Sequence, residues 1–297
     1  LAASAAPSSA AALRAAGVTA ATKDPPGGRI VRDARGEPTG VFVDAAMALV
    51  DRVVPAPSDA EREAGIERAQ ALALAAGLTE VHEMGLDEAS LAAYKRLNAA
   101  GRLHVRVYAY RSGGTPEDRT RGLEAAPDPR SPDATFHIGG LKLYADGALG
   151  SRGAALLAPY TDAPKERGLV LTPGATLEDT ARRALAAGHQ LAVHAIGDGA
   201  NRSVLDAFEK AGCTSRGDHR FRIEHAQILA PADLPRFARL GVLASMQPTH
   251  ATSDMAWVPA RLGPGRVAGA YAWRSLLQQG ARVVAGSDFP VEEVEPI

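Results

Sequence analysis

"GGLKLYADGALGSR", residues 139–152, places a lysine inside an apolar run. Lys142 lies between Leu141 and Leu143, and the pattern around it is typical of a buried strand. Burying an ammonium group costs several kcal/mol unless another group compensates the charge. The stretch therefore predicts a strand that carries a functional group, whose chemistry depends on what the rest of the chain brings near it.

Helical and strand patterns alternate along the chain from residue 58 onward. Helices are predicted over residues 58–77, 87–101, 176–188, 201–212, 231–241 and 266–280. Strands are predicted over residues 78–84, 102–110, 136–146, 190–196, 221–226, 242–247 and 281–288. Such alternation predicts βαβ units and a parallel sheet. Since no strand is followed by a G-x-G-x-x-G turn, we expect an α/β fold of the (β/α)8 TIM-barrel type rather than a dinucleotide-binding fold.

Residues 1–57 do not follow this alternation. The segment "TKDPPGGRIVRDARGEPTGVFVD", residues 22–44, combines a Pro-Pro-Gly-Gly turn with two short β-like runs, which predicts a hairpin. We therefore expect an insertion segment with a β-hairpin over residues 1–57 and a barrel with seven recognisable strands over residues 58–297.

The composition narrows the functional class. The 297 residues carry a formal net charge of −1, which gives no basic patch for nucleic acid. No apolar run approaches the ~18 residues of a membrane span, so we expect no membrane partner. A single cysteine, Cys213, excludes an internal disulfide framework and favours a reducing compartment, so a cytoplasmic location is expected.

Polar residues stand near the carboxyl ends of the predicted strands. They are His82, Lys142, His194, His225 and Asp288. In a TIM-type barrel these ends meet at the active site. One βα unit separates His194 from His225, so we expect the two rings to lie close together at the barrel mouth. Two imidazoles and a carboxylate suit a divalent metal such as zinc, and a carboxylate beside activated water serves as a general base.

Lys142 has two chemical roles open to it. It can be a Schiff-base nucleophile with a lowered pKa. Its neutral amine can instead react with carbon dioxide to give a carbamate, an anionic ligand able to bridge two metals. The nearby histidines and aspartate favour the carbamate, because a Schiff-base enzyme needs no such cluster.

The chain resembles the amidohydrolase superfamily, in particular amidohydrolase family 3 with its N-substituted formamide deformylase-like proteins. The motifs "LKLYADGALGSR", "LAVHAIGDGAN", "FRIEHAQ", "SMQPTHATSD" and "AGSDFPVE" occur in the family's order. The resemblance implies that Lys142 is a carboxylated lysine bridging two metals and that His194 and His225 ligate one of them. It implies that Asp288 binds the other metal and shuttles the proton of the attacking hydroxide.

The resemblance also implies a substrate and its contacts. Asp146, Arg152 and His250 fall in family motifs on strand-end loops, and together with His82 they are the predicted substrate-binding residues. The implied activity is metal-dependent hydrolysis of a non-peptide C–N bond in a small amide-type or formamide-type molecule. The implied cofactor is a divalent metal, zinc, as one or two ions; a homodimer is left open.

One departure from the family concerns the metal site. The family's first barrel strand carries a His-x-His pair, whereas none of the eight histidines here are spaced that way. We therefore expect an incomplete barrel, with the first strand and the C-terminal β-sandwich segment outside this chain. A catalytically inactive fragment and a Schiff-base lyase using Lys142 remain the alternatives. Glu224 is expected to point to the opposite face of its strand from His225 and to be paired structurally.

Overall fold

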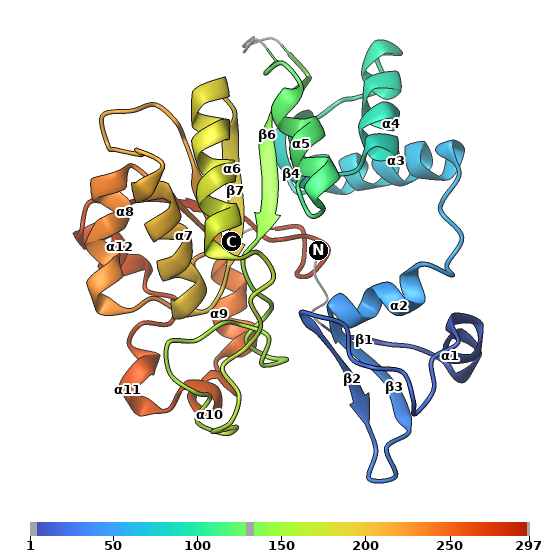
Figure 1. Ribbon diagram of the computed structural model, residues 1–297. Coiled ribbons are helices and arrows are strands. Elements are labelled where there is room, and N and C mark those ends of the chain that lie inside the picture. The colour runs from blue at the N-terminus through green and yellow to red at the C-terminus, as the bar shows by residue number, and fades with distance from the viewer. Residues whose placement is uncertain (1–4, 129–133, 296–297) are drawn as a thin grey trace.

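The computed structural model describes residues 5–128 and 134–295, and Figure 1 shows how their elements are arranged. The central feature is a seven-stranded parallel sheet in which the strands neighbour one another in chain order. Its members are β4 (Glu80–Leu86), β5 (Arg106–Ser112), β6 (Phe136–Tyr144), β7 (Gln190–Ala195), β8 (Arg222–His225), β9 (Leu243–Met246) and β10 (Arg282–Ala285). The predicted strands are thus present, and the α/β fold is a curled half-barrel consistent with an incomplete TIM-type barrel.

Helices connect the strands and cover the outer side of the sheet (Figure 1). They include α3 (Asp59–Ala75), α4 (Glu88–Ala99), α6 (Gly174–Ala187), α7 (Asp198–Lys210), and a short 3-10 turn, η2 (Pro231–Asp233), that leads into α8 (Leu234–Leu240). Helix α3 begins with a capping box, because the Ser58 side chain accepts from the backbone of Glu61 and the Glu61 carboxylate accepts from the backbone of Ser58. The largest apolar core fills the space between β6–β9 and α6–α8.

The single helix predicted over residues 266–280 is wrong. The segment forms α11 (Pro264–Val267) and α12 (Trp273–Gln278), with a break between them. In the break, Gly269 accepts a hydrogen bond from the Leu229 amide, and the Tyr271 amide donates to the Gln227 carbonyl. A Cβ at Gly269 would lie 2.1 Å from the Leu229 oxygen, so only glycine allows this approach. Tertiary backbone pairing therefore replaces the helical pattern that the sequence suggests.

Three further helices lie in segments that the sequence patterns left as loops. They are α5 (Pro116–Glu124), α9 (Pro248–Asp254) and α10 (Val258–Leu262), and proline occupies the first turn of each. These helices are short, which explains why a periodic apolar face does not reveal them.

The N-terminal residues build a separate three-stranded sheet. Its elements are β1 (Ala5–Pro7), α1 (Ala10–Ala16), β2 (Gly28–Arg32), β3 (Pro38–Asp44), η1 (Ala45–Met47) and α2 (Ala48–Asp51). Strands β2 and β3 pair antiparallel as a hairpin, and Ile30, Phe42 and Val50 belong to its own apolar cluster. In Figure 1 this sheet lies on the side toward which the arrow of β6 points. The division of the chain into domains at residue 58 stays a prediction.

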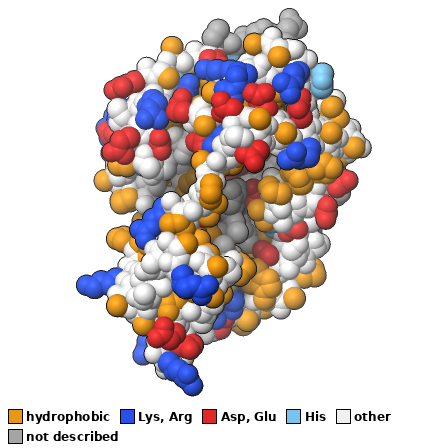
Figure 2. Space-filling view, turned by 90° about the vertical axis from the view of Figure 1, so that its right-hand side faces the viewer, with side chains coloured by type: hydrophobic (Ala, Val, Ile, Leu, Met, Phe, Trp, Pro, Cys, Tyr) orange, Lys and Arg blue, Asp and Glu red, His pale blue; other side chains and the backbone are white. Residues whose placement is uncertain are grey.

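The two edges of the large sheet are open among the described strands, since β4 and β10 each have one neighbour. Large apolar side chains such as Leu72, Val284 and Phe289 are exposed. Figure 2 shows hydrophobic side chains along a hollow between the upper and lower parts of the molecule. Within the described part of the chain, none of the helices has the length and apolar character needed to cross a lipid bilayer.

Candidate metal centre

A pocket opens at the carboxyl ends of the parallel strands, with about 340 Å³ of empty space that is partly open to solvent. This is the end at which a TIM-type barrel places its active site. The pocket is lined by Met84, Lys142, Tyr144, His194, Glu224, His225, Gln247 and Asp288. Four of the residues singled out from the sequence thus meet in one place: Lys142, His194, His225 and Asp288.

Lys142 is the most buried cation in the pocket, with 4% of its surface exposed. Its Nζ lies 3.7 Å from the centre of the Tyr144 ring, two residues along the same strand face. Burial lowers the pKa of the amine to about 8, while Glu224 and Asp288 oppose that effect and Arg222 adds to it. The neutral amine that either role of Lys142 requires is therefore accessible close to neutral pH.

His194 and His225 come from the adjacent strands β7 and β8, and their ring centres are 4.6 Å apart. The expected proximity of the two rings is found. His225 has a φ of 74°, a left-handed conformation that turns its ring away from the regular strand alternation. Its Nδ1 lies 2.8 Å from Oε1 of Gln247. Burial lowers the pKa of both imidazoles, and the nearby Lys142 lowers both further, so the rings are suited to act as neutral ligands.

Asp288 and His250 lie at the outer side of the pocket. Asp288 follows β10 with a φ of 59°, and its side chain is 28% exposed. Nε2 of His250, on α9, is 4.0 Å from Oδ2 of Asp288 and 4.0 Å from Oε1 of Glu292. The His250 ring centre is 5.9 Å from that of His225. His250 is thus beside the pocket without belonging to its lining, and its contact with a substrate stays a prediction.

Glu224 does not point away from the site as the strand alternation predicted. Its carboxylate lines the pocket and also accepts two hydrogen bonds from Arg222, at 2.5 and 3.1 Å. The expected structural pairing is therefore present, but the expected face is wrong. The left-handed backbone of His225 brings both residues to one pocket although they are adjacent in the chain.

His82 and Arg152 lie outside this pocket. His82 is 41% exposed at its side chain, and its Nδ1 is 2.7 Å from a guanidinium nitrogen of Arg222. Arg152 donates to both carboxylate oxygens of Asp162, at 3.2 and 3.0 Å. Neither residue lines this pocket, and their contact with a substrate stays a prediction.

Asp146 is also outside the pocket lining and is fully buried. Its carboxylate accepts hydrogen bonds from the backbone amides of Ala155, Ile196 and Gly197. Burial raises the pKa of this carboxyl group to about 8, although the amide groups oppose the rise. Its oxygens are bonded to these amides and Asp146 does not line the pocket, so its predicted contact with a substrate stays a prediction.

The sequence analysis missed Tyr144, Gln247 and Met84 as lining residues. Tyr144 has a readable signal, since residues two apart on a strand share a face and Lys142 was already placed. Gln247 directly follows β9, which, like β5, had no site residue proposed at the end of the strand itself. Met84 has an ordinary apolar side chain, so no chemical signal marked it.

The donor atoms fit part of a metal shell. In His194, Nε2 lies beside Asp146 and has no hydrogen-bond partner among the described residues, so Nδ1 is the ring nitrogen left to hold a metal. In His225, Nδ1 contacts Gln247, which leaves Nε2 available to a metal. Metal-binding histidines are commonly oriented by such a contact to their other ring nitrogen. Within residues 5–128 and 134–295, however, no group of three or more His, Cys, Asp or Glu side chains could hold a metal. The pocket therefore offers two imidazoles and Lys142, and a complete shell needs further donors.

The sequence profile of the amidohydrolase family matches residues 2–297. The chain belongs to the amidohydrolase family. Its membership agrees with the resemblance seen in the motifs and with the position of the pocket on the sheet.

Individual relatives support the same assignment. YtcJ of Bacillus subtilis (strain 168) is 37% identical over 97% of this chain and 54% of its own length. N-substituted formamide deformylase of Arthrobacter pascens is 29% identical over 96% of this chain and 54% of its own. The crystal structure of an uncharacterized metal-dependent hydrolase from Pyrococcus furiosus matches with a TM-score of 0.78 and 30% identity, over 99% of this chain and 58% of that chain. The chain thus spans about half the length of the curated relatives that it matches.

Proposed function

We propose that this chain carries part of the active site of a metal-dependent hydrolase that cleaves a C–N bond in an amide-type or formamide-type small molecule. The observation that carries the proposal is the meeting of Lys142, His194, His225 and Asp288 in one pocket. A divalent metal ion, zinc in this proposal, would be held by the two imidazoles and Lys142. When bound, it supplies a Lewis acid that polarises a carbonyl group and lowers the pKa of water.

Lys142 takes part as a carbamate. Its neutral amine adds to carbon dioxide, forming an N–C bond and releasing one proton, which leaves an anionic group in the pocket. This modification removes the buried positive charge and supplies oxygen donors. The lowered pKa of Lys142 supports it, because only the unprotonated amine reacts.

Asp288 acts as the general base and acid. It accepts a proton from the attacking water and later delivers it to the leaving nitrogen. Its partial exposure at the mouth of the pocket suits a group that exchanges protons with substrate. His250, beside Asp288, contacts the substrate in this proposal.

The test compares metal-loaded and chelator-treated protein in hydrolysis of an N-substituted formamide and of a simple amide. We expect hydrolysis that follows the zinc content and disappears with His194→Gln. A matched control is His189→Gln, since His189 is also buried but bonds the Ala125 carbonyl outside the pocket. Activity that is independent of metal would contradict the proposal.

One observation, the lowered pKa of Lys142, also fits a Schiff-base lyase. Borohydride added with a carbonyl substrate would then attach the substrate covalently to Lys142. We expect no such adduct. An inactive fragment would instead show neither an adduct nor bound zinc.

A further inference from the structure

Asp146 occupies an unusual position for a carboxylate, directly after the strand that carries Lys142 and fully inside the protein. Ala155 and Gly197 each donate a backbone hydrogen bond to Oδ2 at 2.8 Å, and Ile196 donates one to Oδ1 at 3.0 Å. These amides come from the loop after β6 and from the turn between β7 and α7. The carboxylate is therefore fixed in place from two sides.

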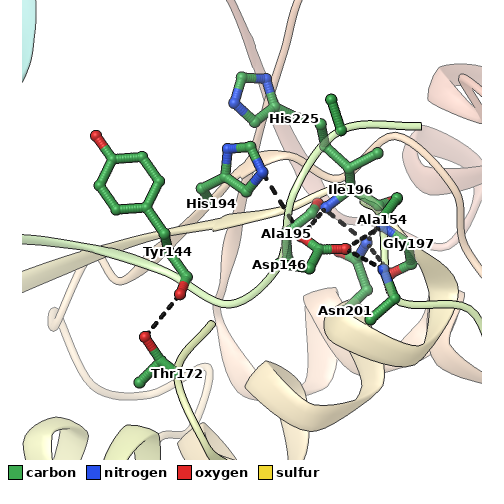
Figure 3. Close-up of polar contacts among 12 residues, drawn as sticks. Tyr144, Asp146, Ala154, Thr172, His194, Ala195, Ile196, Gly197, Asn201 and His225 are labelled. Atoms are coloured by element: carbon green, nitrogen blue, oxygen red, sulfur yellow. Dashed lines mark hydrogen bonds and ion pairs between the residues drawn. The ribbon is translucent and has the colours of Figure 1, made fainter. Parts of the chain in front are cut away.

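His194 lies beside this fixed carboxylate. Its Nε2 is 3.6 Å from Oδ1 of Asp146, which is within ion-pair distance but longer than a hydrogen bond. Figure 3 shows the Asp146 carboxylate next to one nitrogen of the His194 ring, with the His225 ring on another side. Nε2 is buried and has no hydrogen-bond partner among the residues that the structure describes. The three amide donors oppose the rise in the pKa of Asp146 that burial causes, and Oδ1 faces Nε2 as an acceptor.

We propose that Asp146 is a positioning residue for His194. A carboxylate oxygen beside Nε2 favours the tautomer with its proton on Nε2 and leaves Nδ1 unprotonated. An unprotonated ring nitrogen is what a metal ion requires, so the consequence for metal binding rests on the proposed function. The effect on the ring itself does not.

The position of the two groups in the chain makes this coupling rigid. His194 lies two residues before Ile196, and the Ile196 and Gly197 amides bond the same carboxylate that faces the ring. The end of β7 therefore holds Asp146, and Asp146 in turn faces the histidine of β7. A small displacement of the carboxylate would affect both the turn and the ring.

A purely structural role in anchoring the loop is the competing explanation, and Asp198 provides the control. Asp198 is also buried and accepts a hydrogen bond from the Leu157 amide at 2.9 Å, so it ties the same loop to the start of α7. No contact between Asp198 and His194 is found in the described residues. Asp198→Asn should therefore disturb the loop without changing the His194 ring.

The experiment reads the His194 tautomer by nitrogen-15 NMR of histidine-labelled, chelator-treated protein, with His194→Gln identifying the signal. We expect a protonated Nε2 in the unmodified protein, a mixed or reversed tautomer in Asp146→Asn and no change in Asp198→Asn. A proton on Nδ1 in the unmodified protein would overturn the proposal even if no variant folds. An unchanged tautomer in Asp146→Asn, or equal changes in both variants, would also overturn it.

Zinc titration separates this inference from the proposed function. We expect Asp146→Asn to weaken zinc binding by about 10–100-fold, the usual effect of losing a group that orients a metal-bound histidine. If the unmodified protein binds no zinc but shows the expected tautomer, the proposed metal centre is wrong and the positioning of His194 stands. If zinc instead binds equally well to the unmodified protein and to Asp146→Asn while the tautomer differs between them, Asp146 positions the ring but does not affect metal binding. The metal part of the proposal is then wrong.

Discussion

The centre and the edges of the seven-stranded sheet carry polar side chains at comparable strand ends, but their surroundings differ. His194 and His225, on β7 and β8, are buried between neighbouring strands on both sides. His82 on β4 and Asp288 after β10 are at the two edges and are 41% and 28% exposed. Packing therefore holds the functional groups at the centre in place, whereas the polar groups at the edges are partly exposed to solvent.

This difference explains why the pocket offers an incomplete set of metal ligands. At the centre, residues from a neighbouring strand can orient an imidazole. Gln247, directly after β9, contacts the His225 ring of β8 in this way. Strand β4 brings only Met84 to the pocket, and His82 faces Arg222 instead. The predictions below test this division between the centre and the edges.

The largest expected effect is at the centre. Lys142→Ala should lose bound metal and hydrolytic activity together, because the pocket loses the group that becomes its anionic ligand. Added short carboxylic acids should restore part of both. Metal content and turnover are measured on the same samples, with Lys95→Ala, an exposed lysine on α4, as the control. Full metal content in Lys142→Ala would show that Lys142 is not needed to bind the metal.

At the edge, Asp288→Asn should leave the fold intact and lower turnover by about 10²–10⁴-fold, the usual contribution of a general acid or base. The amide can still lie near a metal but cannot accept a proton. Steady-state rates and thermal unfolding are compared in the same preparations. Turnover close to that of the unmodified protein would mean that another residue is the base.

Two ion pairs contrast the regions directly. Arg222 and Glu224, on β8, are 8% and 6% exposed at their side chains, while Arg106 and Glu80, on β5 and β4, are 49% and 42% exposed. Arg222→Met should lower the free energy of unfolding by about 3–5 kcal/mol, because the buried carboxylate of Glu224 loses its guanidinium partner. Arg106→Met should lower it by about 0–1 kcal/mol.

Urea unfolding checks this contrast. A double variant, Arg222→Met with Glu224→Gln, should recover most of the loss, since neither position of the pair then carries a buried charge. Equal losses for Arg222→Met and Arg106→Met would mean that the centre and the edge do not differ in burial as described.

A pH-dependent effect on stability is expected from Lys142 at the centre of the sheet. The pKa of Lys142 is lowered from 10.5 to about 8 in the folded protein. Between these values the unfolded chain holds a proton that the folded chain has lost, so stability should rise with pH, by about 3 kcal/mol in total. Chelator-treated protein in buffer free of carbon dioxide should show this rise. Lys142→Met should lack it and Lys95→Met should keep it; a slope that persists in Lys142→Met would assign it to another group.

The sequence alone determined the strand order and much of the site. Alternating apolar and helical patterns gave the seven strands, because local periodicity reflects burial. Polar residues at strand ends identified Lys142, His194, His225 and Asp288, since the carboxyl ends of parallel strands meet at one side of the sheet. The capping box at Ser58 was also readable, because it involves neighbours three residues apart.

Only the tertiary structure decided the rest. Glu224 joins the pocket because of the left-handed backbone of His225, and the helix predicted over residues 266–280 is broken because Gly269 and Tyr271 pair with distant backbone groups. Asp146 looked like a substrate contact from its motif, yet its oxygens bind amides that lie 9 to 51 residues away. Such contacts depend on how loops from different strands meet, and local sequence patterns carry no information on that.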